Sequence, residues 1–338
     1  DVTVTSAERG TLRGVAVHLE REERTDAGGD PRDALVVMRI DGPSRFRGQD
    51  RDGRPVELDS GSVLQVIVDG ESMKVPFAED VALRYGVEGS DFFALRAGSI
   101  QDLDVDTRRF EATDGVDFET DGLEGSGRGR ADSLLVFGES EMQLRGSASE
   151  LAHLEFTPIA SGEAADRFVA DAERIRLLRE TGFTAEGTVQ VSGTAGSSEL
   201  LLTANRAELV VDPLPPGSAA PDANTVRDFS LEAEAVERIA LTRPEQIVGL
   251  ASQRIVVSGI VRGALLEGSE GDEEDPNAPP PVEPFHLLAE GAVVLDLEVD
   301  SSKLSPELEG AAKIFGNGAL FTMDAAGNGM LTPEEAGR

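Results

Sequence analysis

Residues 183–212, FTAEGTVQVSGTAGSSELLLTANRAELVVD, decide the fold because their pattern recurs elsewhere in the chain. Valine and leucine alternate with polar residues on both sides of a Gly/Ser-rich turn, which predicts two β-strands with one buried face each. The sequence ANRAEL at residues 204–209 loosely repeats ADAERI at residues 170–175, 34 residues earlier. A weaker copy of the cycle covers residues 110–146. Such a unit buries its apolar face by stacking on its neighbours, so the sequence predicts one continuous apolar lining.

Alternation with period two extends this pattern to other parts of the chain. Residues 102–106 and 293–300 alternate valine or leucine with carboxylates, which is typical of a half-buried strand with a solvated acidic face. A cation held between two such strands is the less favoured alternative. Gly-containing turns recur at intervals of about 8 to 12 residues, a spacing that favours a sandwich, barrel or solenoid. The predicted fold class is all-β.

Three segments have helical propensity instead. Residues 165–180 and 231–241 are rich in Ala, Glu, Arg and Leu, and propensity alone predicts helices there. Residues 305–315 are a cleaner candidate, since Ser305 can cap the helix, Pro306 follows it, and Gly316 can end it. We therefore expect a short C-terminal helix.

Composition excludes several kinds of chemistry. The 338 residues carry 31 basic and 64 acidic side chains, for a net charge of −33, which argues against non-specific nucleic-acid binding. The chain has no cysteine, hence no thiol nucleophile, disulfide or thiolate metal site. Its three histidines lack metal-ligand spacing, and we find no nucleophile elbow, phosphate-binding loop or dinucleotide fingerprint. We expect a protein that is not an enzyme.

The sequence also gives expectations about location and domain organisation. No apolar stretch is long enough to span a membrane, and the chain begins at Asp1 without a signal-like segment, as expected for the mature form of an exported precursor. Five carboxylates at residues 270–275 and three consecutive prolines at residues 279–281 predict a surface excursion over residues 267–284. We expect two β-repeat regions, residues 1–155 and 156–300, the second containing that excursion, and a tail at 301–338.

The repeat resembles that of the OstA-like family, the periplasmic lipopolysaccharide-transport proteins such as LptA and LptC. The family cycle reads approximately "a-x-G-n-V", then "A-d-r-a", then "l-x-l-x-G", and residues 183–191 with 200–212 are the closest match. Residues 110–146 are the second match. The tyrosine usual after the "A-d-r-a" step is replaced by Leu209 and Leu134. The resemblance implies an open β-jellyroll in which residues 168–178 and 231–241 are strands despite their propensity.

The same resemblance implies a function. Two sheets would enclose an apolar groove that holds the acyl chains of a lipopolysaccharide-like amphiphile in the periplasm or cell envelope. Edge strands would pair with a second copy or with a related jellyroll. Arg128, Arg130 and Arg145 are the candidates for contact with the head group, and ordinary solvent exposure explains them equally well. The groove candidates are Val116, Phe118, Leu134, Val136, Met142, Leu144, Val189, Val191, Leu200 and Leu202.

Two alternatives to lipid transport stay open. The candidate groove residues can equally form a closed dry core, and the stacked sheets then serve as a scaffold that assembles through its edges. The charge of −33 favours this alternative, since it repels an anionic head group. The third hypothesis is a calcium-stabilised surface module.

The calcium hypothesis rests on the C-terminal sequence DAAGNGMLTPEE. It is similar to an EF-hand loop, with Asp324, Asn328 and Glu335 at positions that supply oxygen ligands. Ala326 removes one carboxylate from the pattern, so we expect no cofactor other than weakly bound calcium. A Gly-rich turn without metal is the alternative.

Overall fold

The structure is a computed structural model, and every element that it describes is a β-strand. It describes residues 2–6, 10–25, 31–69, 72–87, 91–122, 125–139, 141–158, 167–178, 181–195, 198–212, 226–243, 246–262, 285–299, 312–323 and 329–333. The all-β prediction is confirmed. The chain divides into two compact units. Unit 1 comprises Asp1–Gly122 with Gly127–Ala152, and unit 2 comprises Leu123–Ser126 with His153–Arg338.

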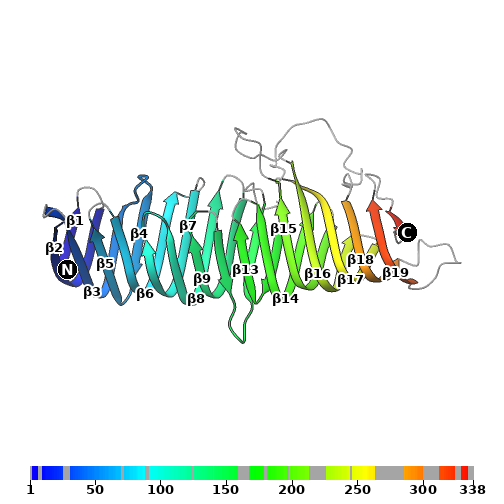
Figure 1. Cartoon of the computed structure of the whole chain (residues 1–338), viewed down its shortest axis with the longest axis horizontal. Helices are drawn as coiled ribbons and strands as arrows, with labels where there is room; N and C mark the ends of the chain where they lie inside the picture. Colours follow the sequence, from blue (N-terminus) through cyan, green and yellow to red (C-terminus); the bar gives the residue numbers. More distant parts are fainter. Residues whose placement is uncertain are drawn as a thin grey trace, which may run out of the picture. The chain divides into compact units, whose positions relative to one another are not determined.

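Most of the long strands pair antiparallel with the strand that follows them in the sequence (Figure 1). The first half of the chain contains β1 (Val2–Ser6), β2 (Gly10–Thr25), β3 (Pro31–Gln49), β4 (Pro55–Ser60), β5 (Val63–Asp69), β6 (Ser72–Val87), β7 (Asp91–Asp104), β8 (Arg109–Gly122), β9 (Gly125–Phe137) and β10 (Glu141–Arg145).

The second half contains β11 (Ala152–Thr157), β12 (Phe168–Ala172), β13 (Arg174–Leu178), β14 (Gly182–Ala195), β15 (Ser198–Val211), β16 (Val226–Arg243), β17 (Gln246–Arg262), β18 (Phe285–Val299), β19 (Ala312–Met323) and β20 (Gly329–Pro333).

Long strands in unit 1 bend in the middle and contribute one half to each of two sheets. Residues 35–41 of β3 pair with β5, whereas residues 44–49 pair with β4. Strand β6 divides its pairing between the same two short strands. Strands β4 and β5 therefore correspond to the two halves of one bent strand. We call the sheet that contains β5 sheet 1 and the sheet that contains β4 sheet 2.

Backbone conformations that L-residues rarely adopt produce these bends. Gly42, Asp80, Asp114 and Gly187 have φ of +94°, +53°, +66° and +96° at the bends of β3, β6, β8 and β14. In β8 and β14, a segment similar to the "A-x-G-x-V" step of the repeat forms the bend. In β14, the bend lies at Gly187, and the residues before and after it, Ala185 and Val189, are both buried. A bend thus adds residues to the strand while both halves keep their apolar side chains inside.

Unit 2 follows the same plan. Strands β12 and β13 pair with the two halves of β14, and β14–β19 then pair in order, each with a register irregularity near its middle. Residues 168–178 and 231–241 are therefore strands, as predicted from the resemblance and contrary to their helix propensity. The prediction of a helix over residues 305–315 is wrong for residues 312–315, which belong to β19. Residues 300–311 lie outside the described residues.

The outer face of unit 2 carries a row of alternating charges. Arg174 lies opposite Glu186, which lies opposite Arg206, and the row continues through Glu234 to Arg254. The Arg174 and Glu186 side chains are 3.0 Å apart. Opposite charges on neighbouring strands stabilise a sheet and oppose a slip in its register. Part of the chain's large acidic charge is therefore neutralised locally.

A pair of glycine substitutions tests the geometry of the bends. In Gly98→Ala, the added methyl would lie 2.6 Å from Asp114 Cβ and 2.9 Å from the Asp114 carbonyl oxygen. We expect the free energy of unfolding to fall by about 2–3 kcal/mol. Gly115→Ala, at φ +79° in open space, should cost only about 1 kcal/mol. Urea denaturation followed by circular dichroism measures both values, and equal losses would contradict the packing argument.

Candidate functional site

The ten predicted groove residues all point into the interior. Their exposed fractions range from 0% at Leu134 to 7% at Leu200. Six lie in unit 1 and four in unit 2. The interior is therefore closed at these positions, so an apolar ligand can reach them only if the two sheets separate.

Aromatic contacts join the facing sheets. In unit 1, Phe93 of sheet 2 meets Phe110 of sheet 1 with ring centroids 6.0 Å apart. In unit 2, Phe168 on β12 contacts Phe229 in the half of β16 that belongs to the opposite sheet, at 5.5 Å. Edge-to-face and tilted aromatic pairs add stabilisation beyond the area they bury. These rings fill the space between the sheets.

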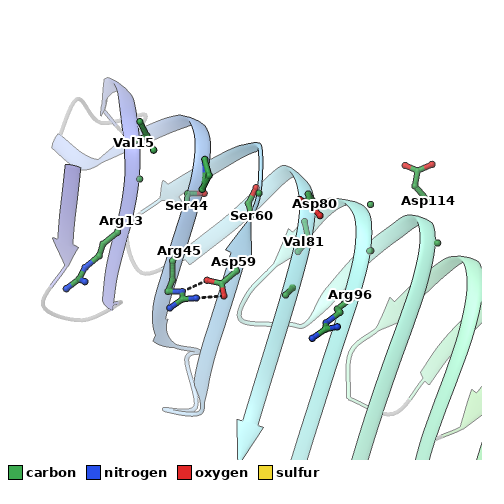
Figure 2. A pocket seen from close by; sticks show the side chains of 17 residues that line it. Arg13, Val15, Ser44, Arg45, Asp59, Ser60, Asp80, Val81, Arg96 and Asp114 are labelled. Carbon is green, nitrogen blue, oxygen red and sulfur yellow. Dashed lines mark hydrogen bonds and ion pairs between the residues drawn. The ribbon is translucent and has the colours of Figure 1, made fainter. Parts of the chain in front are cut away.

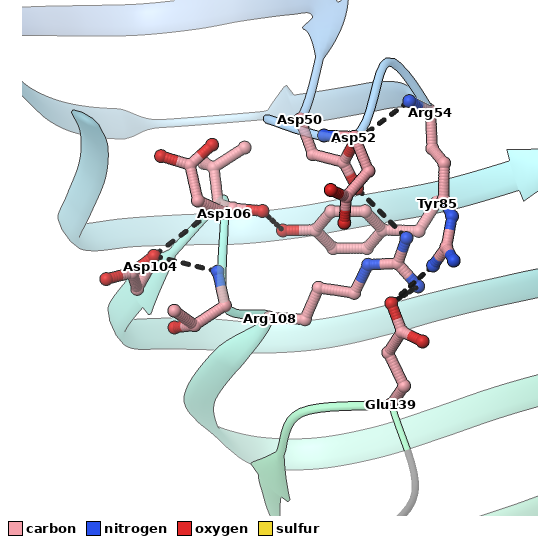
Figure 3. A network of polar contacts seen from close by, with 10 residues as sticks. Asp50, Asp52, Arg54, Tyr85, Asp104, Asp106, Arg108 and Glu139 are labelled. Atoms are coloured by element: carbon pink, nitrogen blue, oxygen red, sulfur yellow. Dashed lines mark hydrogen bonds and ion pairs between the residues drawn. The ribbon is translucent and has the colours of Figure 1, made fainter. Parts of the chain in front are cut away.

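In unit 1, a group of charged residues closes the side opposite the bends. We call this side, formed by strand ends and turns, the rim. Asp50 and Arg54 lie in the turn between β3 and β4 of sheet 2, whereas Arg108 and Glu139 lie in turns of sheet 1 (Figure 3). With Tyr85, near the end of β6, they form the rim cluster. It joins two sheets that are otherwise connected through the bends and interior contacts.

The central contact of the rim cluster is a buried ion pair. Arg108 Nη2 donates to Asp50 Oδ2 at 2.9 Å, and the two side chains are 7% and 1% exposed. The Asp50 Oδ1 atom also accepts the backbone N–H groups of Asp52 and Arg54 at 3.0 and 2.9 Å. Burying a charge is costly unless it is paired and hydrogen-bonded, and this carboxylate is both. The pair therefore holds the two turns together.

Two arginines converge on a single exposed carboxylate above this pair. Glu139 Oε1 accepts a hydrogen bond from Arg54 Nη1 and lies 3.4 Å from Arg108 Nη1. The Glu139 side chain is 49% exposed, in contrast to the buried Asp50. One carboxylate is thus fixed inside the cluster and the other faces solvent.

Tyr85 supports the Arg108 guanidinium. The Arg108 Cζ atom lies 5.1 Å from the centroid of the Tyr85 ring, a cation–π distance. The Tyr85 hydroxyl donates to the Val105 carbonyl of the opposite sheet at 3.4 Å. Burial raises the pKa of the Tyr85 hydroxyl far above its usual value, because the phenolate would be desolvated. Tyr85 is the only tyrosine in a chain without tryptophan, so its spectroscopic signals report on the rim alone.

Local sequence positions Arg108 in its turn. Asp104 Oδ1 accepts the backbone N–H groups of Asp106 and Thr107 at 3.1 and 3.0 Å. Arg108 itself has φ +53°, a conformation in which glycine or asparagine is the usual residue. The ion pair with Asp50 compensates for this backbone cost.

The rim of unit 2 also contains a buried arginine. Arg227 donates from Nε to the Asp212 carbonyl at 2.6 Å and from Nη1 to the Pro158 carbonyl at 2.5 Å. Pro158 follows β11. Strand β11 lies beside β12, as the distance of 2.8 Å between His153 Nδ1 and Asp171 Oδ1 shows. Arg227 is the second residue of β16, in the half of that strand that belongs to the opposite sheet. Each unit is therefore closed at its rim by a buried arginine.

A shallow trough of about 970 Å³ follows the bends on the outside of unit 1 (Figure 2). Arg13, Arg96 and the ion pair of Arg45 with Asp59 line one side. Asp114 lines the other and accepts hydrogen bonds from Ser99 and Thr113, so it stabilises the bends. We assign no ligand to this trough.

The three arginines predicted to contact the head group do not line this trough. Arg128, Arg130 and Arg145 are exposed, and Arg128 lies 4.0 Å from Glu119 on the outer face of the sheet. The rim cluster is not among the residues predicted from sequence, because charged residues in hairpin turns have the pattern of an ordinary surface. One sequence signal pointed to this cluster: the charge-rich sequence DRDGR at residues 50–54 does not occur in any other turn of the chain.

The calcium prediction falls largely outside the described residues, which include neither Asp324 nor Asn328 nor Glu335. Gly329–Pro333 forms β20 and pairs with β19. Within the described part of the chain, no three histidine or carboxylate side chains cluster as metal ligands, and Asp104 uses its carboxylate to hold a turn. Calcium binding stays a prediction.

Comparisons with known proteins give no relative: the chain matches no family model, no curated protein and no solved structure. In the described part of the chain, no helix is long and apolar enough to cross a bilayer.

A matched pair of substitutions measures the contribution of the rim ion pair. Asp50→Asn removes the charge that faces buried Arg108, and we expect a loss of about 3 kcal/mol or more in the free energy of unfolding. Asp59→Asn, which breaks an exposed pair with Arg45, should cost less than about 1 kcal/mol. Chemical denaturation compares the two, and a small effect of Asp50→Asn would show that the sheets are held by other contacts.

Alkaline titration tests the burial of Tyr85. Its folded-state pKa lies above the unfolded value of 10.0, so its contribution to stability is present below pH 10 and is lost as the pH rises further. We expect phenolate absorbance to appear only together with the loss of the circular dichroism signal. Ionisation of Tyr85 in the folded protein near pH 10 would contradict the described rim.

Proposed function

We propose that the chain is a non-enzymatic cell-envelope protein that holds the acyl part of an amphiphile between its two sheets. The observation that carries this proposal is the distribution of buried polar side chains. Among the residues whose burial is described, these side chains lie at the bends (Ser44, Ser60, Ser99) or toward the rim (Asp50, Arg108, Thr120, Arg227). The interior between bends and rim is therefore uniformly apolar.

The energetics of this interior fit an acyl chain. Each methylene transferred from water contributes about 0.8 kcal/mol, so a partly buried chain binds with useful affinity. The interior is packed, and a ligand must therefore replace contacts between the two sheets, such as the one between Phe93 and Phe110. Separation along the rim accomplishes this without breaking hydrogen bonds between strands of one sheet. The rim would open as the ligand enters and close again over the bound acyl chain, while the bends keep the two sheets joined.

Quenching by brominated fatty acid tests the interior directly. Because the chain has no tryptophan, Phe118→Trp introduces a single indole among the buried residues of unit 1. Brominated myristate should quench its fluorescence through contact with the acyl chain. Phe77→Trp on the outer face of β6 is the matched control and should be quenched much less. Equal quenching of the two variants, or no quenching of either, would refute binding between the sheets.

Native mass spectrometry identifies the natural occupant. Protein purified from its own envelope should carry a co-purifying amphiphile that organic solvent extracts.

A structural role is the second candidate, favoured by the burial of all ten groove residues. If the interior is a permanent core, the sheets serve as a scaffold, and β1, paired only with β2 among the described strands, offers an edge for strand addition. Sedimentation velocity over a range of concentrations tests this alternative. Reversible self-association without bound lipid supports the scaffold, whereas a monomer at all concentrations argues against it.

A further inference from the structure

We propose that Arg54 and Arg108 form the binding site for the anionic head group of the amphiphile, and that the Glu139 carboxylate occupies this site in the ligand-free protein. This inference rests on the proposed function and adds to it the chemical class of the ligand. The head group is a carboxylate or a phosphate, since both present oxygens that two guanidinium groups can bind.

The geometry of the two arginines carries the inference. Both guanidinium groups approach the same atom, Glu139 Oε1, one as a hydrogen-bond donor and the other at 3.4 Å. Two cations around one carboxylate oxygen form a site for an anion, and here a side chain of the protein supplies that anion. A ligand carboxylate would take its place with no change in the net charge of the cluster.

The difference in burial shows which partner can leave. Arg108 is held from two further sides, by the Asp50 carboxylate and by the Tyr85 ring, and is 7% exposed. Arg54 is fixed through its backbone N–H, which donates to Asp50. Glu139 is half-exposed at a turn, between β9 and β10, so its carboxylate can move into solvent while both arginines stay in place.

The site lies where an acyl chain would leave the interior. Tyr85 is directly opposite Phe93 in the ladder between β6 and β7, and Phe93 contacts Phe110 across the gap between the sheets. These rings connect the rim cluster to the apolar interior. An amphiphile bound between the sheets would place its head group at Arg54 and Arg108. This arrangement also answers the objection raised by the charge of −33, because the head group meets two cations locally.

The test compares an anionic amphiphile with a neutral one. Myristate and monomyristoylglycerol are titrated by calorimetry, with Tyr85 fluorescence as a second signal from the rim. Glu139→Gln removes the internal competitor and should raise the affinity for myristate about tenfold, with little change for the neutral ligand. Arg54→Gln should lower the affinity for myristate by a similar factor. Glu119→Gln, near Arg128 on the outer face, is the control and should change neither.

The outcomes separate this inference from the proposed function. If both ligands bind and Glu139→Gln leaves their affinity ratio unchanged, the head-group site is refuted while binding between the sheets stands. If neither ligand binds any variant, both proposals fail. Inorganic phosphate is a separate arm: binding as tight as that of myristate would assign the site to a free anion and overturn the amphiphile. Thermal melting of each variant confirms that its fold is intact, since a purely structural Glu139 predicts weaker stability and no gain in affinity.

Discussion

The bend in each long strand is the constraint on which the rest of the structure depends. An antiparallel ladder cannot turn a corner without extra residues, and Gly42, Asp80, Asp114 and Gly187 adopt positive φ where four of the strands bend. Since neighbouring strands bend at the same level, the two halves of each strand face each other and bury one apolar layer. The bends also determine where the rim lies, and hence where charged side chains can meet across the two sheets.

The bend also explains how much of the fold could be predicted from sequence. Alternation with period two identified strands such as those within residues 102–106, 183–212 and 293–300, because each half-strand is regular. At a bend, however, two or three exposed residues separate consecutive buried ones, as between Ala172 and Ile175 or between Val236 and Ile239. That spacing matches one face of a helix, so in residues 165–180 it adds to the helix propensity that the composition already gives. Only the family resemblance predicted strands there.

The candidate site was less accessible to sequence reasoning for a different physical reason. Asp50 and Arg108 are 58 residues apart, and Arg54 and Glu139 are 85 apart. Each is a charged residue in a hairpin turn, and local sequence treats such residues as solvated. The burial of Asp50 and Arg108 follows from the facing of two sheets, which no local pattern encodes. The apolar residues of the interior were predictable, because alternation within a single strand determines which side chains share its buried face. This holds whichever strand it pairs with.

Pairing between consecutive strands has a consequence for how each unit folds. Most of a strand's contacts are with the strands next to it in the ladder, so stability is close to a sum of intrinsic and nearest-neighbour contributions, as in repeat proteins. Such an array can nucleate at any well-packed pair and grow outward one strand at a time. It also frays from its edges, so β1 and β20, each with one partner among the described strands, would exchange their amide protons early.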